Sequence, residues 1–145
     1  MTTDARSVGQ CPECGAPCVD GLGCREQFGQ ILVWEVDDAE LRAVHFVTVA
    51  SYNLQHPAWL TDEAITGLRQ AYIDHLDRGV SVAEIRRRVS AAAAGAKRVR
   101  RDAASVRPVL RAWPMTIDEV YHDAQPDGAA ERVRQWARAI RSTLG

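Results

Sequence analysis

Long hydrophobic runs are missing from this sequence. No segment approaches the roughly 18 uninterrupted apolar residues that a membrane-spanning helix needs, and the N-terminal segment MTTDARSVGQ carries neither a basic leader nor an apolar signal core. We therefore expect a protein that is not embedded in a membrane and is not exported by the usual route. The cytoplasm is its expected location, and a membrane is not an expected partner.

A large net charge is missing as well. The formal net charge is only −1, and the apolar fraction of 46% and the charged fraction of 26% are those of ordinary globular proteins rather than disordered chains. A chain of 145 residues has the commonest size of a single domain and can bury about two-thirds of its unfolded surface. A metal ion is therefore not needed to hold the whole fold together.

The sequence does contain four cysteines within residues 11–24. Disulfides are rare in the reducing cytosol, where a dense cysteine cluster more often binds a metal ion. Cys11 and Cys14 are separated by two residues and followed by Gly15, a spacing that lets both thiolates reach one ion from a tight turn. Cys24 stands where a helical pattern begins, and the helix dipole there favours a thiolate. We predict a zinc ion held by these three thiolates and a fourth ligand.

The fourth ligand is open between Cys18 and a histidine. If the helices on either side of residues 37 and 38 form an antiparallel hairpin, the numbers of facing residues add up to about 75, which places His56 opposite the cysteine loop. His45 lies about three turns back along the same helix. We favour His56 and keep Cys18 and His45 as alternatives. The competing interpretations of the cysteines are an iron–sulfur cluster, a disulfide pair or metal-free thiols.

Hydrophobic periodicity and capping residues predict an all-α fold, a small helical bundle with an N-terminal zinc-binding cysteine loop. Residues 1–24 form the tail and the zinc-binding loop, and residues 25–145 form the helical domain packed on it. Residues 95–112 either continue the fourth helix or form a linker. The predicted helices span residues 25–36, 39–55, 62–77, 82–94, 117–122 and 128–143.

Four segments occur in a characteristic order: the CPECG knuckle, the helix REQFGQILVWE, the segment YNLQHP, and WPMTIDEV ahead of a C-terminal helix. In this respect the chain resembles an uncharacterised family of small bacterial proteins, catalogued only as a domain of unknown function. The likeness runs from Cys11 to about Ala139, and its most specific element is the pairing of CPxCG with YxLQHP. It implies no activity, but it favours a histidine as the fourth ligand, because Cys18 is not part of the family's pattern. The residues that match the pattern are Cys11, Cys14, Cys24, His45, Tyr52 and His56.

His45, Tyr52 and His56 are spaced by seven and four residues, so they share one stripe of the predicted second helix. The residues of this stripe are polar, whereas a helix face that packs into a core is normally apolar. One interpretation is that these groups satisfy one another's hydrogen bonds beneath the cysteine loop. The other is a pocket in which His45 acts as a general base or ligand and Tyr52 as a hydrogen-bond donor.

Positive charge is concentrated between residues 86 and 111, where nine Lys or Arg residues accompany the single acid Asp102. Such a run could bind phosphate backbones, but few aromatic residues interleave with it, which argues against a stacking surface for single strands.

Three functional hypotheses follow. The favoured hypothesis is a zinc-binding helical protein of unknown biological role. It would act as a binding or accessory module with a structural zinc and an unidentified small-molecule or protein partner. The second is a zinc-dependent enzyme with an open metal position beside His45 and Tyr52. The third is a nucleic-acid-binding protein that uses the basic residues 86–111.

Overall fold

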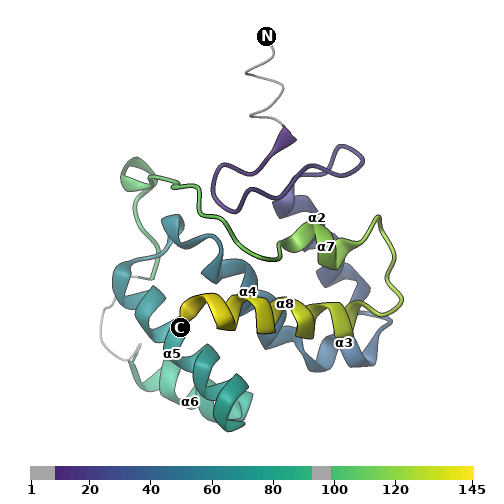
Figure 1. Cartoon of the computed structure of the whole chain (residues 1–145). Helices are drawn as coiled ribbons and strands as arrows, with labels where there is room; N and C mark the ends of the chain where they lie inside the picture. The colour runs from purple at the N-terminus through teal and green to yellow at the C-terminus, as the bar shows by residue number, and fades with distance from the viewer. Residues whose placement is uncertain (1–8, 93–98) are drawn as a thin grey trace.

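A computed structural model describes residues 9–92 and 99–145 of the chain (Figure 1). These residues fold into helices joined by loops, so the predicted all-α class is confirmed, and β structure within them is limited to isolated bridges. No helix in these two ranges is long and apolar enough to cross a membrane. Residues 1–8 of the predicted tail and residues 93–98 of the basic run lie outside the described part. The helices are α2 (Cys24–Trp34), α3 (Ala39–Ala43), α4 (His45–Leu54), α5 (Asp62–Arg78), α6 (Val82–Ala92), α7 (Ile117–Tyr121) and α8 (Ala129–Leu144), with the 3-10 turns η1 (Pro57–Trp59) and η2 (Ala103–Ser105).

Capping residues start the helices where the sequence predicts. The Thr61 hydroxyl accepts the N–H of Ala64 at 3.2 Å at the start of α5, and Thr116 begins α7 with a capping box. Each such side chain satisfies a backbone N–H group that has no partner inside the helix. Helix α5 ends at Gly79, whose φ of 68° lies in the left-handed region that glycine adopts without a steric penalty.

The predicted helix over residues 39–55 is in fact two helices. Helices α3 and α4 meet at Val44, whose φ of −104° and ψ of 21° lie in the bridge region between helix and strand. The N–H of Val44 donates to Leu41 three residues back instead of four, so the α-helical hydrogen bonding is interrupted. Val44 is β-branched, and β-branched residues lose rotamer freedom in a helix, which makes a break less costly there.

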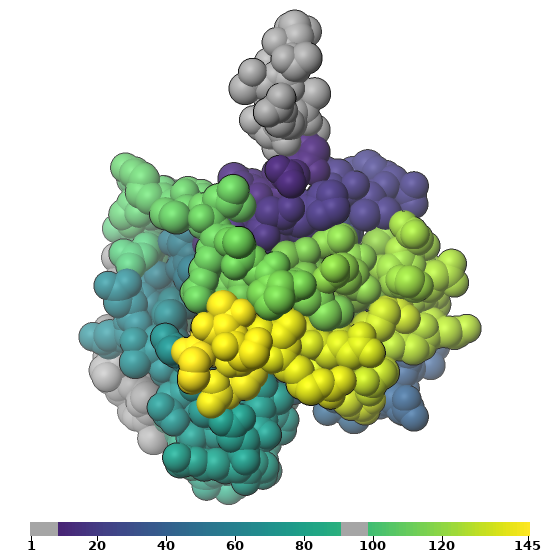
Figure 2. Space-filling model, in the orientation of Figure 1, coloured from purple at the N-terminus to yellow at the C-terminus, as the bar shows by residue number. Residues whose placement is uncertain are grey.

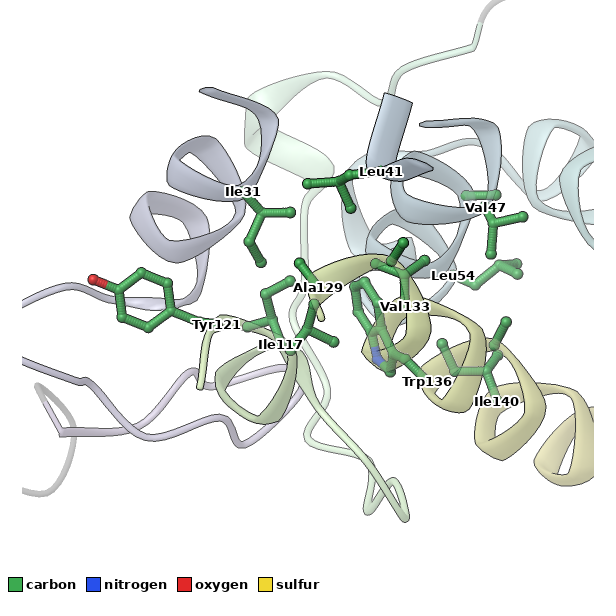
Figure 3. Close-up of a cluster of buried hydrophobic side chains, with 14 of the residues drawn as sticks. Ile31, Leu41, Val47, Leu54, Ile117, Tyr121, Ala129, Val133, Trp136 and Ile140 are labelled. Atoms are coloured by element: carbon green, nitrogen blue, oxygen red, sulfur yellow. The ribbon is translucent and has the colours of Figure 1, made fainter. Parts of the chain in front are cut away.

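The core forms around α8, which packs against α3, α4 and α7 (Figure 1). The predicted apolar stripe of α8 is confirmed, because Val133, Trp136 and Ile140 are fully buried. Figure 3 shows Val133 and Trp136 between Ile117 of α7 and Leu54 of α4. Ile31 of α2 and Leu41 of α3 belong to the same buried cluster. The core therefore joins the N-terminal helices, which carry the cysteines and histidines, to the C-terminal ones.

Polar groups on α4 are buried but hydrogen-bonded. The Gln55 amide donates to the Met115 carbonyl at 2.8 Å, and its oxygen lies 3.3 Å from the Trp136 indole nitrogen. Ser51 Oγ lies 2.8 Å from the hydroxyl of Tyr72. Buried polar groups without partners would destabilise the fold, whereas these groups fix how α4 packs against α5 and α8.

Residues 99–112, which we call the strap, run along the surface from α5 to the cysteine loop (Figure 1). They are not α-helical, so within this range the linker interpretation is correct, and residues 95–98 lie outside the described part. At one end the N–H of Arg101 donates to Trp59 at 3.0 Å, and at the other the N–H of Arg111 donates to Glu13 at 3.1 Å. The strap is therefore tied to both η1 and the cysteine loop.

Candidate metal centre

The cysteine loop, residues 11–24, begins as a tight turn. The N–H of Cys11 donates to Ala16 at 2.9 Å, and the N–H of Gly15 donates back to Cys11 at 3.0 Å. Gly15 has a φ of 80°, a conformation that glycine supplies without strain. The turn brings the sulfurs of Cys11 and Cys14 to the same side, as the two-residue spacing predicts.

Four potential ligand atoms come together in this region. The sulfurs of Cys11, Cys14 and Cys24 and a ring nitrogen of His56 all lie within 4.8 Å of one another. Nε2 of His56 is 3.6 Å from the Cys11 sulfur and 3.4 Å from the Cys24 sulfur. Sulfur and nitrogen ligands of a tetrahedral zinc ion, with bond lengths near 2.3 and 2.0–2.1 Å, are separated by about 3.6 Å. The four groups could therefore hold one metal ion with little movement.

Backbone N–H groups point at the cysteine sulfurs. The N–H groups of Glu13 and Cys14 lie 3.4 Å from the Cys11 sulfur, and the N–H of Ala16 lies 3.4 Å from the Cys14 sulfur. Cys24 is the first residue of α2, where the helix dipole adds positive potential. These dipoles stabilise negative charge on sulfur, which is the form that binds metal.

His56 is held in the orientation that a metal ligand needs. Its Nδ1 donates to the backbone oxygen of Tyr52 at 2.6 Å, which leaves Nε2 unprotonated when the ring is neutral and directed at the sulfurs. The ring stacks on Tyr52 with 4.1 Å between centroids, and Tyr52 stacks on Phe28 at 4.0 Å. His56 is itself buried, so aromatic rings shield this side of the centre from water.

The sulfurs and the imidazole shift one another's pKa values. Hydrogen bonds from the thiols of Cys14 and Cys24 lower the pKa of Cys11 far below its ordinary value, while the same contacts and burial raise the pKa of Cys14 well above it. Burial alone would lower the pKa of His56, but hydrogen bonds to the sulfurs of Cys11 and Cys24 raise it to about 10. These directions favour negative charge on Cys11, positive charge on His56 and a retained proton on Cys14.

Helices α2 and α4 run antiparallel, and three side-chain pairs fix their register. Glu35 meets His45, Phe28 stacks on Tyr52, and Cys24 meets His56. The residue numbers in each pair add up to 80, whereas a turn at residues 37 and 38 predicts about 75. The difference arises because the connection between the helices contains α3, so its centre lies further along the chain.

His45 and Cys18, the alternative ligands, lie outside this group of four. Nδ1 of His45 is 2.8 Å from a carboxylate oxygen of Glu35, and the histidine side chain is about half exposed. The backbone N–H of Cys18 donates to Gly9 at 2.8 Å. Tyr52, by contrast, stands at the edge of the centre beside His56. The structure thus separates His45 from Tyr52, the two residues of the predicted pocket, along α4.

Two supporting residues were not predicted. The buried amide of Gln27 donates to the carbonyl oxygens of Pro17 at 3.0 Å and Leu22 at 2.9 Å, which attaches the cysteine loop to α2. The carboxylate of Glu13 is also buried and accepts the N–H of Ala58 at 2.7 Å. Gln27 could have been found, because it lies four residues before Ile31 on the buried face of α2.

A family model described as a family of unknown function (DUF5946) matches residues 9–145 of the chain. This range contains all four residues of the centre. Neither the curated proteins nor the solved structures contain a match. The chemistry of the centre therefore has to be argued from its own atoms.

Proposed function

Because the chain belongs to DUF5946, a family of unknown function, we propose its role from the site itself: a helical binding or accessory module whose cysteine loop is held by a structural zinc ion. The observation that carries this proposal is the convergence of three sulfurs and one imidazole nitrogen within 4.8 Å. No disulfide joins the four cysteines, which suits a reducing compartment, and we place the protein in the cytoplasm.

Zinc is the metal that this ligand set favours. Soft thiolates and an imidazole in tetrahedral positions suit zinc, whereas magnesium, calcium and manganese prefer oxygen ligands. An iron–sulfur cluster is most often held by four thiolates, but here the fourth group is the imidazole of His56. Three cysteines and one histidine form a common closed structural zinc site.

A catalytic zinc is less well supported. Three thiolates donate enough charge to weaken the metal as a Lewis acid, and four protein ligands leave no position for water. His45 precedes His56 by eleven residues, or roughly 16 Å along a helix, so it is too far away to act on metal-bound water. Burial and the neighbouring Cys24 raise the pKa of Tyr52, so this side chain stays protonated. A water molecule bound to the zinc in place of a protein ligand would favour the enzyme hypothesis instead.

Purified protein is expected to contain about one zinc per chain, because the loop and His56 together offer four ligands. The Cys18→Ala variant is expected to keep the same zinc content, since Cys18 is not one of the four. Elemental analysis by mass spectrometry measures both. Iron with sulfide in place of zinc, or a disulfide in metal-free protein, would contradict the proposal, and loss of zinc from Cys18→Ala would indicate an all-cysteine site.

Zinc affinity is expected to fall as the pH is lowered from about 8 to about 6. The raised pKa of His56, about 10, means that the metal-free imidazole is protonated throughout this range, and the raised pKa of Cys14 means that this thiol also keeps its proton. Zinc must displace both protons, and each displaced proton weakens binding about tenfold per pH unit. Competition with a chromophoric chelator should therefore give a slope of at least two decades per pH unit. An affinity that does not change with pH would show that the ligands are already deprotonated.

A further inference from the structure

A groove lies between the strap, η1 and the cysteine loop. Its volume of about 360 Å³ falls within the range of about 300–1,000 Å³ that is typical of small-molecule sites. Figure 2 shows the strap on the surface beside the cysteine loop. Three segments that are far apart in the sequence line the groove: Glu13 comes from the cysteine loop, Pro57 and Ala58 from η1, and Arg107 and Val109 from the strap.

Glu13 supplies the negative charge of the groove. The residue is only 5% exposed, and its Oε2 accepts the N–H of Ala58 at 2.7 Å. Within the described residues its Oε1 accepts no hydrogen bond, and no cationic side chain pairs with the carboxylate. A buried carboxylate without a cation is costly, so a protonated amine that reaches Glu13 gains a charge-assisted hydrogen bond.

Arg107 supplies a positive charge. Its Nη1 donates to the backbone oxygens of Ala104 and Val106, both at 2.8 Å, which holds the exposed side chain on the strap. In the part of the chain that the structure describes, its Nε and Nη2 donate no hydrogen bond and no carboxylate pairs with it. Arg101 also lines the groove, but its guanidinium is bound to Asp62 at 2.5 Å. The free donors of Arg107 suit a carboxylate, which can accept two parallel N–H groups.

The backbone around Glu13 holds its carboxylate in place. The N–H of Glu13 lies 3.4 Å from the Cys11 sulfur, and its carbonyl oxygen accepts the N–H of Arg111 at 3.1 Å. With the bond from Ala58, the residue is tied to the metal centre, the strap and η1. A ligand that binds here therefore has little ordering of Glu13 left to do, and such preorganisation favours affinity.

We propose that this groove binds a free amino acid with an apolar side chain. The protonated amine of the ligand binds the Glu13 carboxylate, its carboxylate binds Arg107, and its apolar part contacts Pro57 and Val109. The inference rests on the proposed role as a binding module and names the class of its ligand.

The two charges of the groove disfavour simpler ligands. Glu13 repels a phosphate or another ligand that carries only negative charge, and Arg107 repels a metal cation or a simple amine. An uncharged apolar molecule would take further water away from Glu13 without replacing its hydrogen bonds. A molecule that carries an amine and a carboxylate satisfies both residues.

The test is isothermal titration calorimetry of the purified full-length protein with L-leucine and with 6-aminohexanoate, which carry the same two charged groups at different spacings. At least one of them is expected to bind with a Kd of about 1 mM or tighter. Two analogues of leucine each lack one charged group: 4-methylpentanoate has no amine, and 3-methylbutylamine has no carboxylate. Both should bind at least about tenfold more weakly than the amino acid, because each leaves one charge of the groove unpaired.

Two variants test the residues themselves. Glu13→Gln keeps an oxygen for the N–H of Ala58 but removes the charge, and Arg107→Gln removes the exposed cation; each is expected to weaken binding about tenfold. The matched control is Arg100→Gln, which removes another exposed cation of the strap that does not line the groove. It should change affinity less than about twofold. Circular dichroism checks that Glu13→Gln is folded, and Arg107→Gln provides the test if it is not.

Several results would overturn the inference. They are the absence of binding of both amino acids, equal binding of either single-charge analogue, and tighter binding of inorganic phosphate than of the amino acid. Equal affinities of Arg107→Gln and Arg100→Gln, or an unchanged affinity in folded Glu13→Gln, would also contradict it.

Zinc content is measured on the same samples. A protein with one zinc per chain that binds neither amino acid contradicts the groove proposal and leaves the structural zinc standing. A protein that binds an amino acid but contains no metal contradicts the zinc proposal instead. The two proposals can therefore fail separately.

Discussion

Replacing Cys14 with alanine is expected to abolish stoichiometric zinc binding. Structural zinc binds with an apparent free energy of roughly 10–16 kcal/mol, shared among four ligands, so losing one thiolate should weaken binding by several orders of magnitude. Cys14 is buried in the centre, and alanine supplies no other ligand atom. Elemental analysis of the purified variant should find far less than one zinc per chain.

The same substitution is expected to release the cysteine loop without unfolding the helices. The loop is attached to α2 by Gln27, and although Cys14 belongs to the buried cluster, most of that cluster consists of apolar residues of α4, α7 and α8. Limited proteolysis should therefore cut the variant within residues 11–24, while its circular dichroism stays helical. Cys18→Ala is the matched control, since it removes a thiol from the same loop and should resist cleavage like the wild type. One zinc per chain retained by Cys14→Ala would show that the proposed ligand set is wrong.

Replacing Trp136 with alanine is expected to lower the free energy of unfolding by about 3–5 kcal/mol. Its indole is fully buried on α8 among Ile117, Val133 and Ile140, and the smaller side chain leaves a cavity there (Figure 3). A domain of this size is stable by about 5–15 kcal/mol in total, so the loss is a large fraction. Urea denaturation followed by circular dichroism measures the change.

Two other substitutions serve as controls for the loss of stability in Trp136→Ala. Trp59→Ala removes the same side chain from a site that is 46% exposed, so it should cost less than about 1 kcal/mol. Trp136→Phe keeps most of the apolar volume but leaves the buried oxygen of Gln55 without the indole N–H, which should cost about 1–3 kcal/mol. Equal losses for Trp59→Ala and Trp136→Ala would contradict the assignment of Trp136 to the core.

The sequence predicts those features that depend on local chemistry. Thr61, Gly79 and Thr116 mark helix ends because their capping interactions involve residues only a few positions away. The spacing of Cys11 and Cys14 likewise determines a turn with both sulfurs on one side. Such features need no knowledge of how distant segments pack.

Features that depend on packing were harder to predict. The register of the α2–α4 hairpin differs from the predicted one because α3 lies in the connection between the two helices. Hydrophobic periodicity does not predict the break at Val44. His56 nevertheless reaches the sulfurs, since a shift of five residues is about 1.4 helical turns and leaves His56 near the end of the hairpin. The support from Glu13 comes through Ala58, far along the chain, and no spacing rule connects the two. The His45–Glu35 contact depends on the same long-range register.

The positions of the four candidate metal ligands have a consequence for the order of events during synthesis. All of them lie between residues 11 and 56, whereas the core requires α7 and α8, which begin at Ile117 and Ala129. The four residues of the centre are therefore synthesised before α7 and α8, and before Trp136, which fills the core. Domains of a growing chain tend to fold from the N-terminus. A bound ion would therefore hold α2 against α4 before α8 is made and covers their apolar faces. A metal ion bound at this stage would thus lower the tendency of an unfinished chain to aggregate.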